Sequence, residues 1–109
     1  MSKYFVATLA LVIQPSFLLP ASAQSADPAL GRRIAETTCV ACHQIDAKPA
    51  PQTVKPVAPS FVDVARMPST TELSIKVFLR TSHKSMPNFM LSPEEIDSLA
   101  AYVVGLAKQ

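Results

Sequence analysis

Apolar residues recur with helical spacing at the end of the chain. Ser92 and Glu95 form a capping-box pattern, and Pro93 takes the first helical position between them. A 3.6-residue apolar period follows, which is typical of a helix with one buried face. The sequence therefore predicts a last helix that begins after Ser92, with buried positions at Ile96, Leu99, Ala100, Val103 and Ala107.

A first helix is predicted from Asp27 to about Thr38. Asp27 is a favourable N-cap, and proline at position 28 suits the first helical turn because that turn has unpaired N–H groups in any case. Gly31 lies in the interior of this helix, where glycine costs about 1 kcal/mol relative to alanine. A close approach by another helix would explain why glycine stands there.

The pattern between residues 69 and 82 is ambiguous. Leu73, Ile75, Val77 and Leu79 have the alternating period of a strand, but they also form pairs four residues apart. Ser69 and Glu72 have the spacing of a second capping box. No other segment offers a partner strand, so a helix is predicted here, and a shorter one over the apolar patch from Phe61 to Ala65. The predicted fold class is all-α.

A proline-rich loop is predicted between the first two helices. Residues 47–59 read AKPAPQTVKPVAP, with four prolines in thirteen residues. Proline removes backbone donors and favours extended conformations, so this segment does not form a helix. We interpret it as a stiff wall at the edge of a bound group.

The first 23 residues resemble a signal peptide. Lys3 gives a positive start, Tyr4 to Ile13 is almost entirely apolar, and Ala21-Ser22-Ala23 matches a signal-peptidase site. The alternative is an uncleaved anchor, but Gln14 and Pro15 interrupt the apolar run below the roughly 18–20 residues that span a bilayer. The sequence predicts a signal peptide over residues 1–23, a mature domain over residues 24–109, and export to the periplasm.

The mature chain would be nearly neutral and very small. The whole chain has a formal net charge of +2, and removing residues 1–23 takes away one lysine and leaves +1. This balance argues against binding to nucleic acid, which needs a clustered basic surface. A domain of 86 residues forms only a small core, so a staple or a bound group is expected to fill it.

Cys39-Val40-Ala41-Cys42-His43 is a CxxCH motif, the attachment pattern of c-type haem. The two thiols add to the two vinyl groups of the porphyrin, and the histidine becomes an axial ligand of the iron. A thioredoxin-like site would need a βαβ pattern, and a zinc site a second pair of ligands. A simple disulfide would not need His43. The motif therefore predicts one covalent haem c with iron bound by His43.

Four side chains are candidates for the second axial ligand. Met86 is followed by Pro87 in a loop between two predicted helices, and a thioether there would favour Fe(II) and raise the reduction potential. Met90 is the second choice, whereas Met67 is expected to pack in the core. His83 would give two histidine ligands and a lower potential. The metal ligands predicted are His43 and Met86.

These residues resemble the class I cytochrome c family of bacteria over essentially all of the mature chain. The run from Gly31 to His43 resembles the first helix and haem motif of that family, and Met86-Pro87 resembles its methionine loop. The resemblance implies a small fold of about four helices around one haem. It also implies that Leu99 and Tyr102 lie where the last helix crosses the first, against Gly31.

The resemblance further implies a hydrogen bond between His43 and the carbonyl group of Pro59, which makes Pro59 part of the cofactor site. The sequence departs from the family at Ala58, where a glycine is common, and it contains no tryptophan for the haem propionates. Ala35 replaces an aromatic residue that is often seen midway along the first helix. The remaining candidates for contacts to the propionates are Lys55, Ser60, Arg66 and Tyr102.

The function predicted is electron transfer by a carrier that is not an enzyme and takes no small-molecule substrate. Its partners would be redox proteins, either a dehydrogenase or an oxidase or reductase, and association with a membrane complex is one arrangement considered. The alternative is a gas sensor or a peroxidase-like protein with an open sixth iron site. A third reading is a cytochrome subunit dedicated to one dehydrogenase, which a large exposed apolar patch would favour.

Overall fold

The computed structural model describes residues 25–48, 58–81 and 85–109 and contains four α-helices. They are α1 (Pro28–Ile34), α2 (Phe61–Arg66), α3 (Glu72–Arg80) and α4 (Pro93–Gly105). A π-helical turn, η1 (Ala35–Cys39), continues α1, and a 3-10 turn, η2 (Leu106–Lys108), continues α4. These described parts contain no strand, and the all-α prediction is confirmed, including the helical choice for α3.

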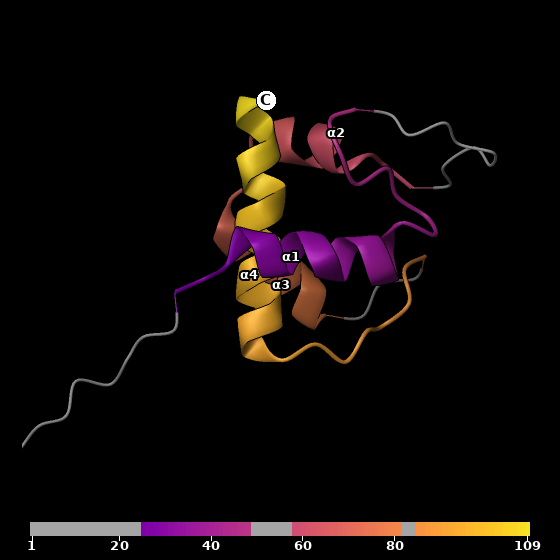
Figure 1. The fold of residues 1–109 in the computed structure, drawn as a ribbon, viewed down its shortest axis with the longest axis vertical. Helices are drawn as coiled ribbons and strands as arrows, with labels where there is room; N and C mark the ends of the chain where they lie inside the picture. Colours follow the sequence, from indigo (N-terminus) through magenta and orange to yellow (C-terminus); the bar gives the residue numbers. More distant parts are fainter. Residues whose placement is uncertain (1–24, 49–57, 82–84) are drawn as a thin grey trace, which may run out of the picture.

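Helices α1 and α4 cross at Gly31 (Figure 1). A Cβ atom at this position would overlap the carbonyl oxygen of Ser98 and lie 2.6 Å from its carbonyl carbon and 2.9 Å from Cα of Leu99. Close backbone approach therefore explains the helix-interior glycine, as the sequence suggested. The buried Ser98 hydroxyl group strengthens the crossing because it accepts a hydrogen bond from the Asp27 backbone N–H at 3.1 Å.

Helix α4 forms the centre of the fold. The expected capping box is present: the Ser92 side chain accepts from the Glu95 N–H, and the Glu95 side chain accepts from the Ser92 N–H. The predicted positions Ile96, Leu99, Ala100 and Val103 are buried.

The prediction for Ala107 was wrong, because Ala107 is exposed and Leu106 is buried instead. The chain tightens into η2 at this point, and the shorter turn moves the buried face back by one residue.

The predicted capping box of α3 was also wrong. Thr71, and not Ser69, is the N-cap, and the reciprocal partner of Thr71 is Ser74 rather than Glu72. A serine at the third helical position can return the hydrogen bond as glutamate does, which moves the start of the helix two residues later. Ile75 and Leu79 pack against the core from this helix.

The core joins all four helices with the segment that follows the CxxCH motif. Helix α2 packs near the C-terminal end of α4 and against η2 (Figure 1). Met67 caps α2 and is 45% exposed, so its expected place in the core was wrong: the chain turns into an extended conformation there. The buried apolar cluster consists of Ile34, Ala35, Cys39, Ile45, Phe61, Ala65, Leu99, Tyr102, Val103 and Leu106.

Several predictions concern residues outside the described ranges. These are the signal peptide of residues 1–23, most of the proline-rich segment, and His83 and Lys55. Within the part of the chain that the structure describes, no helix has the length and apolar character needed to cross a membrane.

Candidate haem site

The CxxCH motif begins at the end of the π-helical turn η1. The Val40 N–H donates to the carbonyl group of Ala35 at 3.0 Å, five residues back, which widens the last turn before the motif. The Cys42 and His43 N–H groups then both donate to the carbonyl group of Cys39, at 3.1 and 2.9 Å. The backbone of the motif is therefore folded into a tight turn that brings the His43 backbone back to the first cysteine.

Both cysteines are free thiols, and they differ in environment. Cys39 is buried and packs in the apolar core, whereas Cys42 is exposed. Burial raises the pKa of the Cys39 thiol to about 11, because the surroundings disfavour a thiolate. A thioether has no proton to lose, so a covalently attached group suits this buried position chemically.

The imidazole of His43 is oriented by the expected contact with Pro59. Its Nδ1 lies 2.7 Å from the carbonyl oxygen of Pro59. A carbonyl oxygen can only accept, so Nδ1 carries the proton and Nε2 keeps the free lone pair that a metal requires. The ring also packs against Phe61, with ring centroids 5.1 Å apart and an interplanar angle of 49°.

Backbone hydrogen bonds tie the segment after the motif to the start of α2. The Ala58 N–H donates to the carbonyl group of Cys42 at 3.2 Å, and the Phe61 N–H donates to that of Gln44 at 2.9 Å. Pro59 stands between these two donors, so its carbonyl group is held beside the His43 ring. Ala58 makes its contact through the backbone, which an alanine supplies as well as a glycine does.

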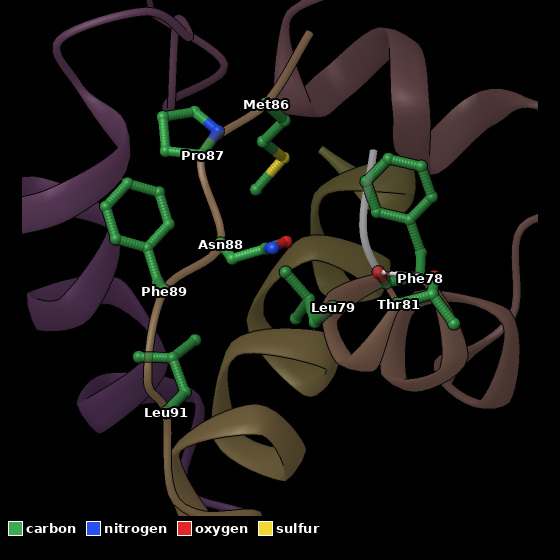
Figure 2. Close-up of a pocket in the computed structure, with 8 residues that line it drawn as sticks. All are labelled: Phe78, Leu79, Thr81, Met86, Pro87, Asn88, Phe89 and Leu91. Carbon is green, nitrogen blue, oxygen red and sulfur yellow. Dashed lines mark hydrogen bonds between the residues drawn. The ribbon is translucent and has the colours of Figure 1, made fainter. Parts of the chain in front are cut away.

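Met86 lies in a small pocket between its loop and α3. The Met86 side chain is half-buried and points into this pocket in Figure 2. The neighbouring apolar wall comes from Leu79 of α3 and Leu91, which both pack against the core. The full lining is Phe78, Leu79, Thr81, Met86, Pro87, Asn88, Phe89 and Leu91.

The competing ligand candidates are placed less favourably. Met90 is fully exposed, and Met67 lies at the exposed end of α2. His83 lies outside the described residues. Among the described residues, no hydrogen bond or ring contact joins His43 to Met86.

The residues present fit a covalent porphyrin. The donor set comprises two free thiols, one oriented imidazole nitrogen and one thioether in an apolar pocket. Large apolar side chains beside these groups are partly exposed: Val40 is 52% exposed, Phe78 46% and Phe89 39%. A porphyrin presents a large apolar plane that such side chains can cover.

The comparison with protein families agrees with this geometry. Residues 26–103 match the family model described as cytochrome c oxidase, cbb3-type, subunit III, which is a monohaem class I cytochrome c domain. The chain belongs to this cytochrome c family. The match covers every described helix from α1 to α3 and most of α4, together with the CxxCH motif and the Met86 loop. No curated protein and no solved structure matches the chain.

Family membership implies electron transfer through haem c in this cytochrome. Members of the family are generally electron carriers rather than enzymes, and they typically work outside the cytoplasm.

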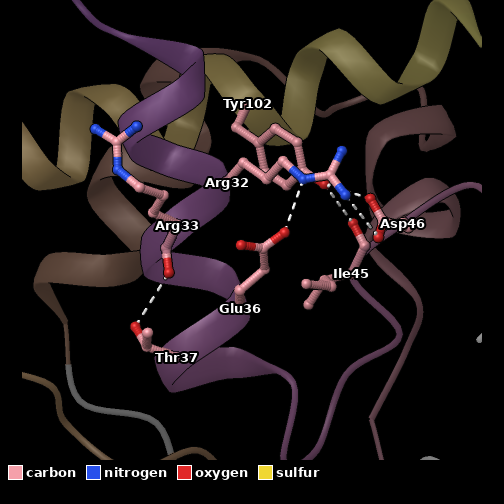
Figure 3. Close-up of polar contacts among 7 residues, drawn as sticks. All are labelled: Arg32, Arg33, Glu36, Thr37, Ile45, Asp46 and Tyr102. Atoms are coloured by element: carbon pink, nitrogen blue, oxygen red, sulfur yellow. Dashed lines mark hydrogen bonds and ion pairs between the residues drawn. The ribbon is translucent and has the colours of Figure 1, made fainter.

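A network of polar contacts links α1 and α4 of this cytochrome to the segment after His43 (Figure 3). The buried Tyr102 hydroxyl group donates to the carbonyl group of Ile45 at 3.0 Å and to Asp46 at 2.9 Å. Arg32 pairs with Asp46 at 3.3 Å and with Glu36 at 2.8 Å. The Glu36 hydrogen bond and the nearby Asp46 charge raise the pKa of Arg32, which keeps it cationic.

Two candidates for contacts to the haem propionates have their hydroxyl protons engaged within the protein. Tyr102 donates to Ile45 and Asp46, and Ser60 donates to Asp63 at 2.7 Å. Propionates accept hydrogen bonds, so a hydroxyl group that is already donating elsewhere is a poor partner. Among the described residues, Arg66 donates one hydrogen bond, at 3.4 Å to the carbonyl group of Gln109, and its guanidinium group has further N–H donors.

Proposed function

We propose that this protein is a periplasmic monohaem c-type cytochrome that carries electrons between redox proteins. Cys39 and Cys42 would hold one haem c through thioether bonds, and His43 and Met86 would be the axial ligands. The observation that carries the proposal is the 2.7 Å contact between His43 Nδ1 and the Pro59 carbonyl group, which leaves Nε2 free next to two unpaired cysteines.

Each residue has a distinct task in this proposal. Pro59 orients the imidazole and, by accepting a hydrogen bond from Nδ1–H, makes Nε2 a stronger donor to iron. The Met86 thioether is a soft ligand that favours the reduced iron and so raises the reduction potential. Phe61, Leu79 and Leu91 exclude water around the ligands, which lowers the reorganisation that accompanies a change of charge. A bound haem c accepts and releases one electron at its iron.

The proposed partners are redox proteins, and the family description favours an oxidase. The family is named after a subunit of cbb3-type oxidase, so association with a membrane-bound oxidase complex is the preferred arrangement. With two propionates, a mature chain of net charge +1 would carry about −1 overall, so docking would depend on local surface rather than on net charge. One surface lysine, Lys76 of α3, already has a partner on the protein, because Asp97 pairs with it at 3.1 Å, so it is a poor docking cation.

The test begins with protein matured in a host that has haem-attachment machinery. Mass measurement of the secreted product should give the chain from Gln24 plus one haem, with the haem retained after denaturation. Cys39→Ser and Cys42→Ser should each remove one thioether bond, and the double variant should lose covalent haem altogether. Release of all haem from the denatured wild type would contradict covalent attachment, and a product that begins at Met1 would contradict the signal peptide.

Carbon monoxide separates an electron carrier from a sensor or peroxidase-like protein. A reduced cytochrome with both axial positions occupied should show no rapid spectral change on exposure to carbon monoxide. Rapid and complete binding would mean that the sixth site is open, and the carrier function would then be rejected in favour of ligand binding.

A further inference from the structure

The segment from Cys42 to Asp46, which we call the proximal segment, is fixed by contacts from three helices. Residues 58–61, at the start of α2, hold it through the Cys42 and Gln44 carbonyl groups and through the His43 ring. On its other side, α4 reaches it through the Tyr102 hydroxyl oxygen and through the core around the Ile45 side chain, and α1 reaches it through Arg32. The proximal segment is therefore held between two supports, and His43 lies between them.

The support from α4 is the buried one. Tyr102 is 8% exposed, and its hydroxyl group is a donor to the carbonyl group of Ile45, a residue whose own side chain lies in the core. In contrast, the Arg32 side chain is 52% exposed and Asp46 is 36% exposed. Exposed ion pairs contribute little to holding a structure, whereas a buried carbonyl group that loses its donor is costly. Tyr102 thus carries more of the constraint than Arg32.

We propose that Tyr102 is a positioning residue for the proximal iron ligand, acting through the hydroxyl contacts that it makes with Ile45 and Asp46. This inference rests on the proposed function, in which His43 binds the iron. Tyr102 holds the Ile45 carbonyl group and the Asp46 carboxylate, which restrains the chain two and three residues after His43. The Pro59 contact then sets the plane of an imidazole whose backbone is already fixed. Without the hydroxyl group, the proximal segment loses its hydrogen bonds to α4 and keeps only the Arg32–Asp46 pair and the packing of Ile45 on that side.

The chain offers a matched pair of variants on one helix. Tyr102→Phe removes only a hydroxyl group and keeps the ring in the core. Ser98→Ala also removes one buried hydroxyl group from α4, but that group accepts from Asp27 at the start of α1, far along the chain from the proximal segment. Both variants lose a hydrogen bond made by a buried residue, so a difference between them reports the place of the bond rather than a general loss of stability.

The experiment uses the oxidised holoprotein and proton NMR of the haem methyl groups. The spread and order of these signals depend on the plane of the axial ligands. If Tyr102 only stabilised the fold, its variant would leave these signals unchanged. Tyr102→Phe should change the pattern of methyl shifts and lower the midpoint reduction potential, because a looser proximal segment admits water, which favours Fe(III). Ser98→Ala should keep both the wild-type pattern and the wild-type potential.

The outcomes distinguish the inference from the proposed function. If the wild type shows no low-spin haem spectrum, the proposed function itself fails. If the wild type shows that spectrum and Tyr102→Phe keeps its methyl pattern and potential, or if Ser98→Ala changes them equally, the positioning role is wrong. Should Tyr102→Phe not fold, Asp46→Ala removes one of the two acceptors at a partly exposed position. It should then produce a smaller change of the same kind, and an unchanged pattern would overturn the inference.

Discussion

Replacing Gly31 with alanine should destabilise this cytochrome strongly, although alanine is the better helix former. The new methyl group would overlap the Ser98 carbonyl oxygen and lie 2.6 Å from its carbonyl carbon. Both atoms belong to the backbone of α4, so no side-chain rotation can relieve the overlap. The helices must move apart instead, and the Asp27–Ser98 hydrogen bond beside the crossing must stretch with them.

The magnitude follows from two opposing terms. Helix propensity favours alanine over glycine by about 1 kcal/mol. Overpacking at a tight contact costs typically about 1–3 kcal/mol, and more where backbone must move. Loss of the hydrogen bond to the buried Ser98 adds about 1 kcal/mol. The net expectation is a decrease of about 2 kcal/mol in the free energy of unfolding.

Gly105 provides the control because it is also helical and has nothing within 4 Å of an added Cβ. Chemical denaturation of the holoprotein, followed by far-ultraviolet circular dichroism, should show a lower midpoint for Gly31→Ala. The same measurement should show an equal or higher midpoint for Gly105→Ala, with a free energy of unfolding that is higher by up to about 1 kcal/mol. Equal stability gains in both variants would refute the close crossing of α1 and α4.

The remaining predictions concern one titration and two helix contacts. Burial and then the Asp46 hydrogen bond raise the pKa of Tyr102 from 10.0 to about 12. The protonated form is thus favoured in the folded state, and this stabilisation is complete below about pH 10 and is lost between about pH 10 and 12. Ultraviolet titration of protein starting at Gln24, in which Tyr102 is the single tyrosine, should show this late ionisation; an ordinary pKa would contradict it. Ser92→Ala should lower the free energy of unfolding by about 1 kcal/mol because the Glu95 N–H loses its cap, and no loss in a denaturation curve would contradict the role of the box. Lys76→Ala should cost less than about 1 kcal/mol, with the difference shrinking at high salt, because its pair with Asp97 is partly exposed.

The sequence was sufficient for the parts of the fold that depend on local patterns. Ser92, Pro93 and Glu95 define the start of α4 within four residues of sequence, and this start is confirmed. Gly31 was also informative, because an interior glycine without a turn implies a close neighbour. The family resemblance and the all-α class are confirmed. The family could be recognised because the CxxCH motif is short and specific and needs no tertiary information.

Other features depend on packing that a local pattern does not contain. The N-cap of α3 could be Ser69 or Thr71 by residue type, and only the path of the chain after α2 selects Thr71. The change to a 3-10 turn at Leu106 shifts the buried face by one residue, which a fixed 3.6-residue period cannot anticipate. The π-helical turn before Cys39 was missed for the same reason.

The network of polar contacts around Tyr102 joins residues far apart in the sequence, and no local pattern marked it. Tyr102 and Asp46 are 56 residues apart, and both residue types are common on protein surfaces, so the sequence does not mark them as partners. Tyr102 appeared in the sequence only as a residue at a helix crossing and a candidate for propionate contacts. Its buried environment became evident only when α4 and the proximal segment were placed side by side.

The axial ligand pair is the central claim, and the oxidised absorption spectrum tests it most directly. A His43/Met86 cytochrome should show a weak far-red band that arises from the bond between sulfur and ferric iron, and Met86→Ala should lose it. Met90→Ala removes a fully exposed methionine four residues away and should keep the band. A wild-type protein without the band, or a band that survives Met86→Ala and disappears in Met90→Ala, would contradict the proposed site.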